Sequence, residues 1–176
     1  PSGAGKTTLC RMLMERLPAL RYSISTTTRS PREGEVDGVD YFFTDVETFK
    51  AGIQANQWAE WAQVHGNYYG TSAVFIDAER AAGRDVLLDI DVQGTVQLCG
   101  KYPDAITIFI MPPSSDVLRQ RLEQRGADSP DIIDKRMANA RREMAQRGAY
   151  RHTVINDRLE TEAETLVSIV RGYQES

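Results

Sequence analysis

A glycine-rich run directly before an amphipathic stretch constrains the fold of this chain more than any other feature. The run is PSGAGKTT, residues 1–8, and leucines then recur every four residues from Leu9 to Leu17, before Pro18. This spacing predicts a helix with one apolar side that ends at the proline. Except for its first glycine, which would precede Pro1, the run matches the phosphate-binding loop G-x-x-x-x-G-K-[ST]. An ordinary glycine turn is the alternative, and the Lys-Thr pair at the helix start favours the phosphate-binding loop.

The chemistry of such a loop predicts a role for its residues. Consecutive backbone N–H groups at a helix start point at a phosphate, and the helix dipole adds to their attraction. Gly3 and Gly5 permit close approach of the backbone, Lys6 reaches the terminal phosphates, and Thr7 offers a hydroxyl to Mg²⁺. The expected contacts to a nucleoside triphosphate come from Ser2, Gly3, Ala4, Gly5, Lys6, Thr7 and Thr8.

Strand and helix patterns alternate near both ends of the chain, which predicts the α/β class with a P-loop NTPase-like parallel sheet flanked by helices. The apolar runs 86–88 and 106–110 are typical of strands buried on both faces, and 153–155 is a shorter candidate. Helical patterns are expected at 72–82, 114–125, 130–147 and 160–174. A phosphate-binding loop normally follows a central strand, so we expect this first core strand to be absent from the chain.

The middle of the chain breaks this alternation. A strand at 41–43, a capping-box pattern at 44–47 and an aromatic hairpin at 58–71 predict an inserted lobe. A second excursion, rich in arginine, predicts a helical lid. The predicted division is a core of residues 1–29, 82–121 and 144–176, a lobe of residues 30–81, and a lid of residues 122–143.

Composition excludes several classes of protein. The 25 acidic and 21 basic residues give a net charge of −4, which argues against a nucleic-acid partner. Two cysteines are too few for a disulfide scaffold or a four-thiolate metal site. No apolar run is long enough to cross a bilayer, so we expect a cytoplasmic protein without a membrane partner. A monomer and a homo-oligomer are both compatible with this sequence.

Two aspartates follow the predicted strand 86–88. Asp89 and Asp91 would lie at the carboxyl end of that strand, where α/β sheets bind ligands. A carboxylate there can hold the water shell of Mg²⁺, so Asp89 and Thr7 are the predicted metal residues, with Asp89 acting through water. Turn contacts made by two strand-end acids are the alternative.

Four further segments resemble the guanylate kinase family. Residues 23–43, SISTTTRSPREGEVDGVDYFF, resemble its nucleotide-acceptor segment, and residues 60–72, EWAQVHGNYYGTS, resemble its guanine-binding hairpin. LDIDVQG at 88–94 and VIND at 154–157 resemble two more family segments. The resemblance extends over essentially the whole chain. It implies in-line phosphoryl transfer from ATP to GMP, and to dGMP, with Mg²⁺, in purine nucleotide metabolism.

The resemblance also implies which residues bind GMP. Two arginine forks and two phenolic hydroxyls suit a phosphate dianion, and a carboxylate with hydroxyls suits the donors N1–H and N2–H and the acceptor O6 of guanine. The implied phosphate ligands are Arg29, Arg32, Tyr41 and Tyr69, and the implied base ligands are Ser25, Glu60, Thr71 and Asp91. Glu35 lies in the acceptor segment, where support of the loop is its expected role.

By the same resemblance, Arg125 and Arg136 are the two lid arginines, and Asn156 lies near the ATP adenine. The expected catalytic residues are Lys6, Arg29, Arg125 and Arg136, which neutralise charge on the transferred phosphoryl group. Two alternatives are a phosphopeptide-binding scaffold module and a P-loop kinase for a sugar phosphate. The intact Gly-Lys-Thr run argues against the first, and the base-reading set argues against the second.

Overall fold

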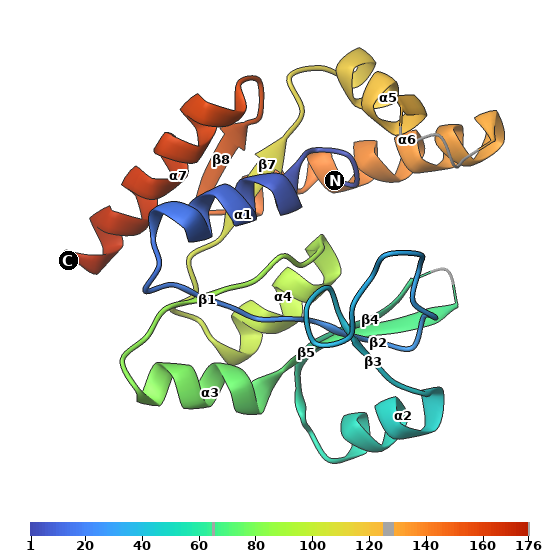
Figure 1. Cartoon of the computed structure of the whole chain (residues 1–176). Coiled ribbons are helices and arrows are strands. Elements are labelled where there is room, and N and C mark those ends of the chain that lie inside the picture. The colour runs from blue at the N-terminus through green and yellow to red at the C-terminus, as the bar shows by residue number, and fades with distance from the viewer. Residues whose placement is uncertain (65, 125–128, 176) are drawn as a thin grey trace. The chain divides into compact units, whose positions relative to one another are not determined.

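The computed structural model describes residues 1–64, 66–124 and 129–175 (Figure 1). The chain forms two compact units, one of Pro1–Leu17 with Ile106–Ser176 and the other of Pro18–Ala105. The chain passes from the first unit to the second after Leu17 and returns to the first at Ile106. Each unit is described by itself. The predicted boundaries of core, lobe and lid follow a different, three-part division and stay predictions.

The first unit consists of helices around one pair of parallel strands. Strand β7 (Ile108–Met111) pairs in parallel with β8 (His152–Ile155). The helices are α1 (Lys6–Arg16), α5 (Ser115–Gln124), α6 (Pro130–Ala145) and α7 (Leu159–Gln174), with a short 3₁₀ turn at Arg147–Ala149. Helix α1 packs on α7, to which Arg16 forms ion pairs with Glu160 and Glu164. Helices α5 and α6 pack together through Leu118, Leu122, Ile133, Met137 and Ala140.

The second unit contains a parallel strand pair and a mixed four-stranded sheet. Strand β1 (Arg21–Tyr22) pairs in parallel with β6 (Val86–Leu87). The larger sheet has the order β3-β2-β5-β4, in which β2 and β3 are parallel and the other pairs antiparallel. Its strands are β2 (Thr26–Thr27), β3 (Phe42–Phe43), β4 (Trp58–Val64) and β5 (Asn67–Ser72). The helices are α2 (Val46–Gln54), α3 (Ala73–Ala81) and α4 (Val92–Lys101).

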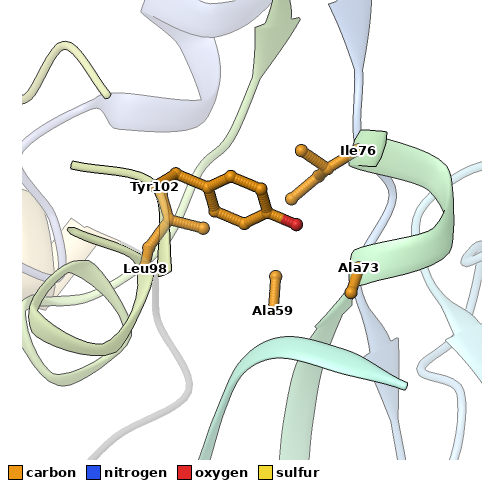
Figure 2. Packing of buried hydrophobic residues seen from close by; sticks show 5 residues of the cluster. All are labelled: Ala59, Ala73, Ile76, Leu98 and Tyr102. Carbon is orange, nitrogen blue, oxygen red and sulfur yellow. The ribbon is translucent and has the colours of Figure 1, made fainter. Parts of the chain in front are cut away.

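One hydrophobic cluster joins α3, α4 and β4 in this unit. Figure 2 shows the ring of Tyr102 among the side chains of this cluster, which are Ala59, Ala73, Ile76 and Leu98. The Tyr102 hydroxyl donates a hydrogen bond of 2.8 Å to Asp77 Oδ1, which satisfies its polar end. The cluster therefore anchors α4 against the strand that carries Glu60.

The predicted elements correspond closely to the observed ones, with three differences. Helix α2 begins after Asp45, which accepts the Thr48 N–H at 2.7 Å, so the expected cap at residue 44 is wrong by one residue. Strand β6 is half-buried rather than buried on both faces, because among the described strands it pairs only with β1. Helix α4 was not expected. No helix in the described part of the chain is long and apolar enough to span a membrane.

Candidate active site

The glycine-rich run forms a tight loop at the start of α1. The Ala4 N–H donates to the Pro1 carbonyl at 3.1 Å, and Lys6 Nζ donates to the same carbonyl at 3.2 Å. Gly5 is the N-cap of the helix, with a φ of 90° that favours glycine. None of the described side chains caps this helix, and its first turn carries no acidic residue. The loop is therefore compatible with an anion at the helix start.

Asn156 lies directly against this loop. It is 1% exposed, and its Nδ2 donates to the Ala4 carbonyl at 2.7 Å. A side chain at Gly5 would overlap the Asn156 amide, so glycine is needed here for space as well as for its φ. Asn156 Oδ1 is buried and has no hydrogen-bond partner among the described residues. Asn156 supports the loop, and its contact with the adenine stays a prediction.

Sequence reasoning missed a second polar residue of this region, Arg121. Its Nη2 donates to the Asn156 carbonyl at 3.0 Å, and its Nη1 is buried with no hydrogen-bond partner in the described part of the chain. The available signal was its position on α5 between the buried Leu118 and Leu122. An arginine on that side of a helix has to direct its charge to a polar group or a ligand.

The structure describes one of the two predicted lid arginines. Arg136 is half-buried on α6, and Arg125 lies outside the described residues. Their joint role therefore stays a prediction.

Three of the four predicted phosphate ligands lie together in the second unit. The Arg29 guanidinium lies 5.3 Å from the centre of the Tyr41 ring, and the rings of Tyr41 and Tyr69 meet edge to face at 6.1 Å. Burial raises the pKa of Tyr41, and the charges of Tyr69 and Asp89 add to the rise. Arg32 is the exposed fourth member.

Three of the four predicted base ligands form a second cluster around Glu60. Thr71 Oγ1 donates to Glu60 Oε1 at 2.5 Å, and both residues are buried, with Glu60 6% exposed. Asp91 caps α4 by accepting the Gly94 N–H at 2.8 Å, so the turn-contact alternative holds for Asp91 without excluding a second contact to a base. Ser25 is half-buried, and its carbonyl accepts the Phe42 N–H; its base contact stays a prediction.

A β-bulge in β4 and the glycine at position 94 determine the position of the Glu60 side chain. Trp58 pairs with Ser72 and Glu60 pairs with Thr71, so β4 advances by two residues where β5 advances by one, and Ala59 is the extra residue of the bulge. The bulge lets Ala59 and Glu60 both be buried, which regular alternation of a strand would prevent. A side chain at Gly94 would overlap the Glu60 carboxyl, so the start of α4 approaches Glu60 only because residue 94 is glycine.

The two clusters share one face of the sheet. Tyr69 and Thr71 are two residues apart on β5, and side chains two apart in a strand point to the same face. Glu60, directly opposite Thr71, lies on that face as well. A molecule with an anionic group at one end and a hydrogen-bonding ring at the other fits this order of residues.

The surroundings of the Glu60 carboxyl shift its pKa. Burial raises its pKa from 4.5 to about 7, the charge of Asp91 adds to the rise, and the Thr71 hydrogen bond opposes it. Near pH 7 the carboxyl is therefore close to half ionised when no ligand is bound.

This pKa predicts a pH-dependent stability. The unfolded chain loses the Glu60 proton near pH 4.5, whereas the folded chain keeps it to about pH 7. The contribution of Glu60 to the free energy of unfolding is therefore complete below pH 4.5 and falls by about 3 kcal/mol as the pH rises to 7. Urea unfolding at pH 5 and pH 8 measures the change, and Glu60→Gln should lack this part of it. An equal pH dependence in both proteins would contradict the prediction.

The predicted metal residues belong to different units. Thr7 is exposed in the first turn of α1, and Asp89 is half-buried just after β6. Hydroxyl and carboxylate oxygens are ligands that suit Mg²⁺. In the described ranges, no group of three His, Cys, Asp or Glu could hold a metal ion, and the joint metal role of Thr7 and Asp89 stays a prediction.

An α/β fold with parallel strand pairs and a glycine-rich loop at the start of its first helix is typical of nucleotide-binding proteins. The family model described as "Guanylate kinase" matches residues 1–173. The chain therefore belongs to the guanylate kinase family, an enzyme family of nucleotide kinases.

Comparisons with individual proteins agree with this family. The guanylate kinase of Dechloromonas aromatica is 50% identical over 172 residues, which cover 98% of this chain and 85% of that protein. That of Geobacter sulfurreducens is 46% identical, with 99% and 86% covered. The crystal structure of guanylate kinase from Anaplasma phagocytophilum superimposes with a TM-score of 0.82 at 31% identity, covering 97% of this chain and 82% of that one. The predicted fold class is confirmed.

Proposed function

We propose that this chain transfers the γ-phosphoryl group of ATP to GMP or dGMP, in cytoplasmic purine nucleotide metabolism. The observation that carries the proposal is the buried pair of Glu60 and Thr71 beside the half-buried Asp91, with Tyr69 of the Arg29 and Tyr41 cluster on the same sheet face as Thr71. The membership of the chain in the guanylate kinase family supports it independently.

Hydrogen-bond polarity explains the choice of guanine. The ionised Glu60 would accept from N1–H and N2–H, while hydroxyls of Thr71 and Ser25 would donate to O6. Asp91 has a second oxygen that can accept from the base. Adenine has the opposite polarity at these atoms, so a buried carboxylate facing it would lose its partners. None of the proposed contacts goes to the ribose 2′-OH, which is why dGMP is included.

The acceptor phosphate would be held by Arg29, Arg32, Tyr41 and Tyr69. It is already an anionic nucleophile, so the chain needs no general base and acts by positioning and charge neutralisation. In this in-line transfer, Lys6, Arg29, Arg125 and Arg136 would stabilise the charge on the moving phosphoryl group.

ATP would bind at the loop of Ser2–Thr8, with Asn156 near its adenine. The backbone N–H groups at the start of α1 would hold the phosphates. Thr7 and Asp89 would hold Mg²⁺, Asp89 through water; when bound, the ion supplies positive charge to the ATP phosphates.

A coupled assay of ADP release tests the proposal. We expect rapid turnover with GMP and dGMP, at least about a hundredfold slower turnover with AMP, and none with ribose 5-phosphate. Turnover on ribose 5-phosphate but not on GMP would favour the sugar-phosphate kinase. GMP binding with no turnover at any Mg²⁺ concentration would favour the scaffold module.

A further inference from the structure

Two of the proposed phosphate ligands meet at one carboxylate, that of Glu35. Arg29 Nη2 donates to Glu35 Oε1 at 2.8 Å, and Arg29 Nη1 donates to Glu35 Oε2 at 2.9 Å. Glu35 Oε2 also accepts the backbone N–H of Arg32 at 2.7 Å. The side chains of Arg29 and Glu35 are 14% and 19% exposed, so this ion pair is largely shielded from water.

The hydrogen bonds leave one edge of Arg29 for another ligand. A guanidinium has five N–H donors in one rigid plane. The two nitrogens at its end face Glu35, and Nη1 also donates to the Ser30 carbonyl at 2.8 Å. The Nε–H and the second Nη2–H lie on the side edge, a second pair of parallel donors that the hydrogen bonds to Glu35 and Ser30 do not use. Tyr69 lies within hydrogen-bonding reach of Arg29 and, with Glu35, raises its pKa.

The plane of the guanidinium is fixed by rings as well as by Glu35. Arg29 Cζ lies 5.3 Å from the Tyr41 ring centre and 5.9 Å from that of Phe43. Arg29 lowers the pKa of Glu35, so the carboxylate stays ionised at neutral pH and the pair persists. The long side chains of Arg29 and Glu35 would otherwise lose much rotamer freedom when a ligand binds. The ion pair and the rings hold them in place beforehand.

We propose that Glu35 is a positioning residue for the acceptor phosphate: it holds the end of the Arg29 fork and the backbone at Arg32 so that the side edge of Arg29 is presented to the phosphate. The proposal rests on the proposed function of this site. In it, Glu35 does not touch the nucleotide.

The sign of one measurement separates this role from simple electrostatics. A carboxylate near a phosphate dianion repels it, so neutralising Glu35 would strengthen GMP binding if charge alone mattered. If Glu35 positions Arg29 and Arg32, the same change weakens GMP binding. Guanosine has no phosphate, and its affinity should not respond to the position of these arginines.

The test is calorimetry of GMP and guanosine with the full chain, its Glu35→Gln variant and a Glu33→Gln control. Glu33 is exposed in the same loop, so the control removes the same charge without removing these hydrogen bonds. We expect Glu35→Gln to raise the Kd for GMP about tenfold and that for guanosine less than about twofold. Glu33→Gln should leave both affinities within about twofold.

Three outcomes overturn the proposal. GMP binding by Glu35→Gln that is unchanged or tighter shows that Glu35 does not position the arginines. An equal loss for GMP and guanosine shows a general role in folding of the lobe. An equal loss of GMP affinity in Glu33→Gln shows an effect of loop charge alone. Failure of the unaltered chain to bind GMP would instead refute the proposed function.

Discussion

Replacing Lys6 by alanine is expected to remove most phosphoryl transfer and to leave GMP binding largely unchanged. Lys6 Nζ donates to the Pro1 carbonyl within the loop of the first unit, and it would exchange this hydrogen bond for the ATP phosphates. Its ammonium then opposes the charge on the transferred group, and loss of such a contact typically lowers kcat by about a hundredfold to a thousandfold. The proposed GMP-binding residues lie in the second unit, so the substitution leaves the contacts among them in place.

The measurements are the rate of ADP release at saturating GMP and the calorimetric Kd for GMP. Lys101→Ala is a matched control, since it removes the same charge from an exposed position at the end of α4. A fall in GMP affinity parallel to the fall in rate would contradict the separation of donor and acceptor sites.

Glu60→Gln is expected to lower kcat/KM for GMP by an amount that corresponds to roughly 2–4 kcal/mol of activation free energy. The amide replaces one acceptor by an NH₂ group that faces a guanine N–H, so a charge-assisted hydrogen bond is lost and two donors meet. The assay belongs at pH 8, because the pKa of Glu60 is raised to about 7 in the empty site. The loss of kcat/KM should be much smaller for AMP, whose N1 is an acceptor. The preference for GMP over AMP should therefore become smaller.

Glu47→Gln is the control for this variant, because Glu47 is exposed in the first turn of α2 and carries the same charge. Equal reductions for GMP and AMP would make Glu60 a structural residue. A selective loss for GMP together with normal ATP binding would support its role as the base reader.

Features that depend on neighbouring residues in the chain were predictable from sequence. The loop before α1, the hairpin of β4 and β5, and the helices of the C-terminal half follow from local spacing and turn residues. The grouping of Arg29, Tyr41 and Tyr69 came from the family resemblance, because 40 residues separate its ends. Their roles as ligands stay predictions.

Features that depend on distant packing were not predictable. Helix α4 contains Gly94 and Gly100, which weaken a helical pattern, and the cap at Asp91 outweighs them only in the folded chain. The raised pKa of Glu60 arises from burial against α4, 34 residues away in sequence at Gly94. Arg121 was missed because its partner, the Asn156 carbonyl, is 35 residues further along.

The bulge in β4 has a consequence for redesign of substrate choice. The extra residue of the bulge determines where the Glu60 side chain points. Deleting Ala59 would restore the regular alternation of β4 and so move the carboxylate without altering its chemistry. Exchanging side chains alone would keep the same backbone path and the narrow space beside Gly94. A library that varies chain length at residues 58–60 therefore samples positions of the Glu60 carboxylate that a point-mutation library does not reach.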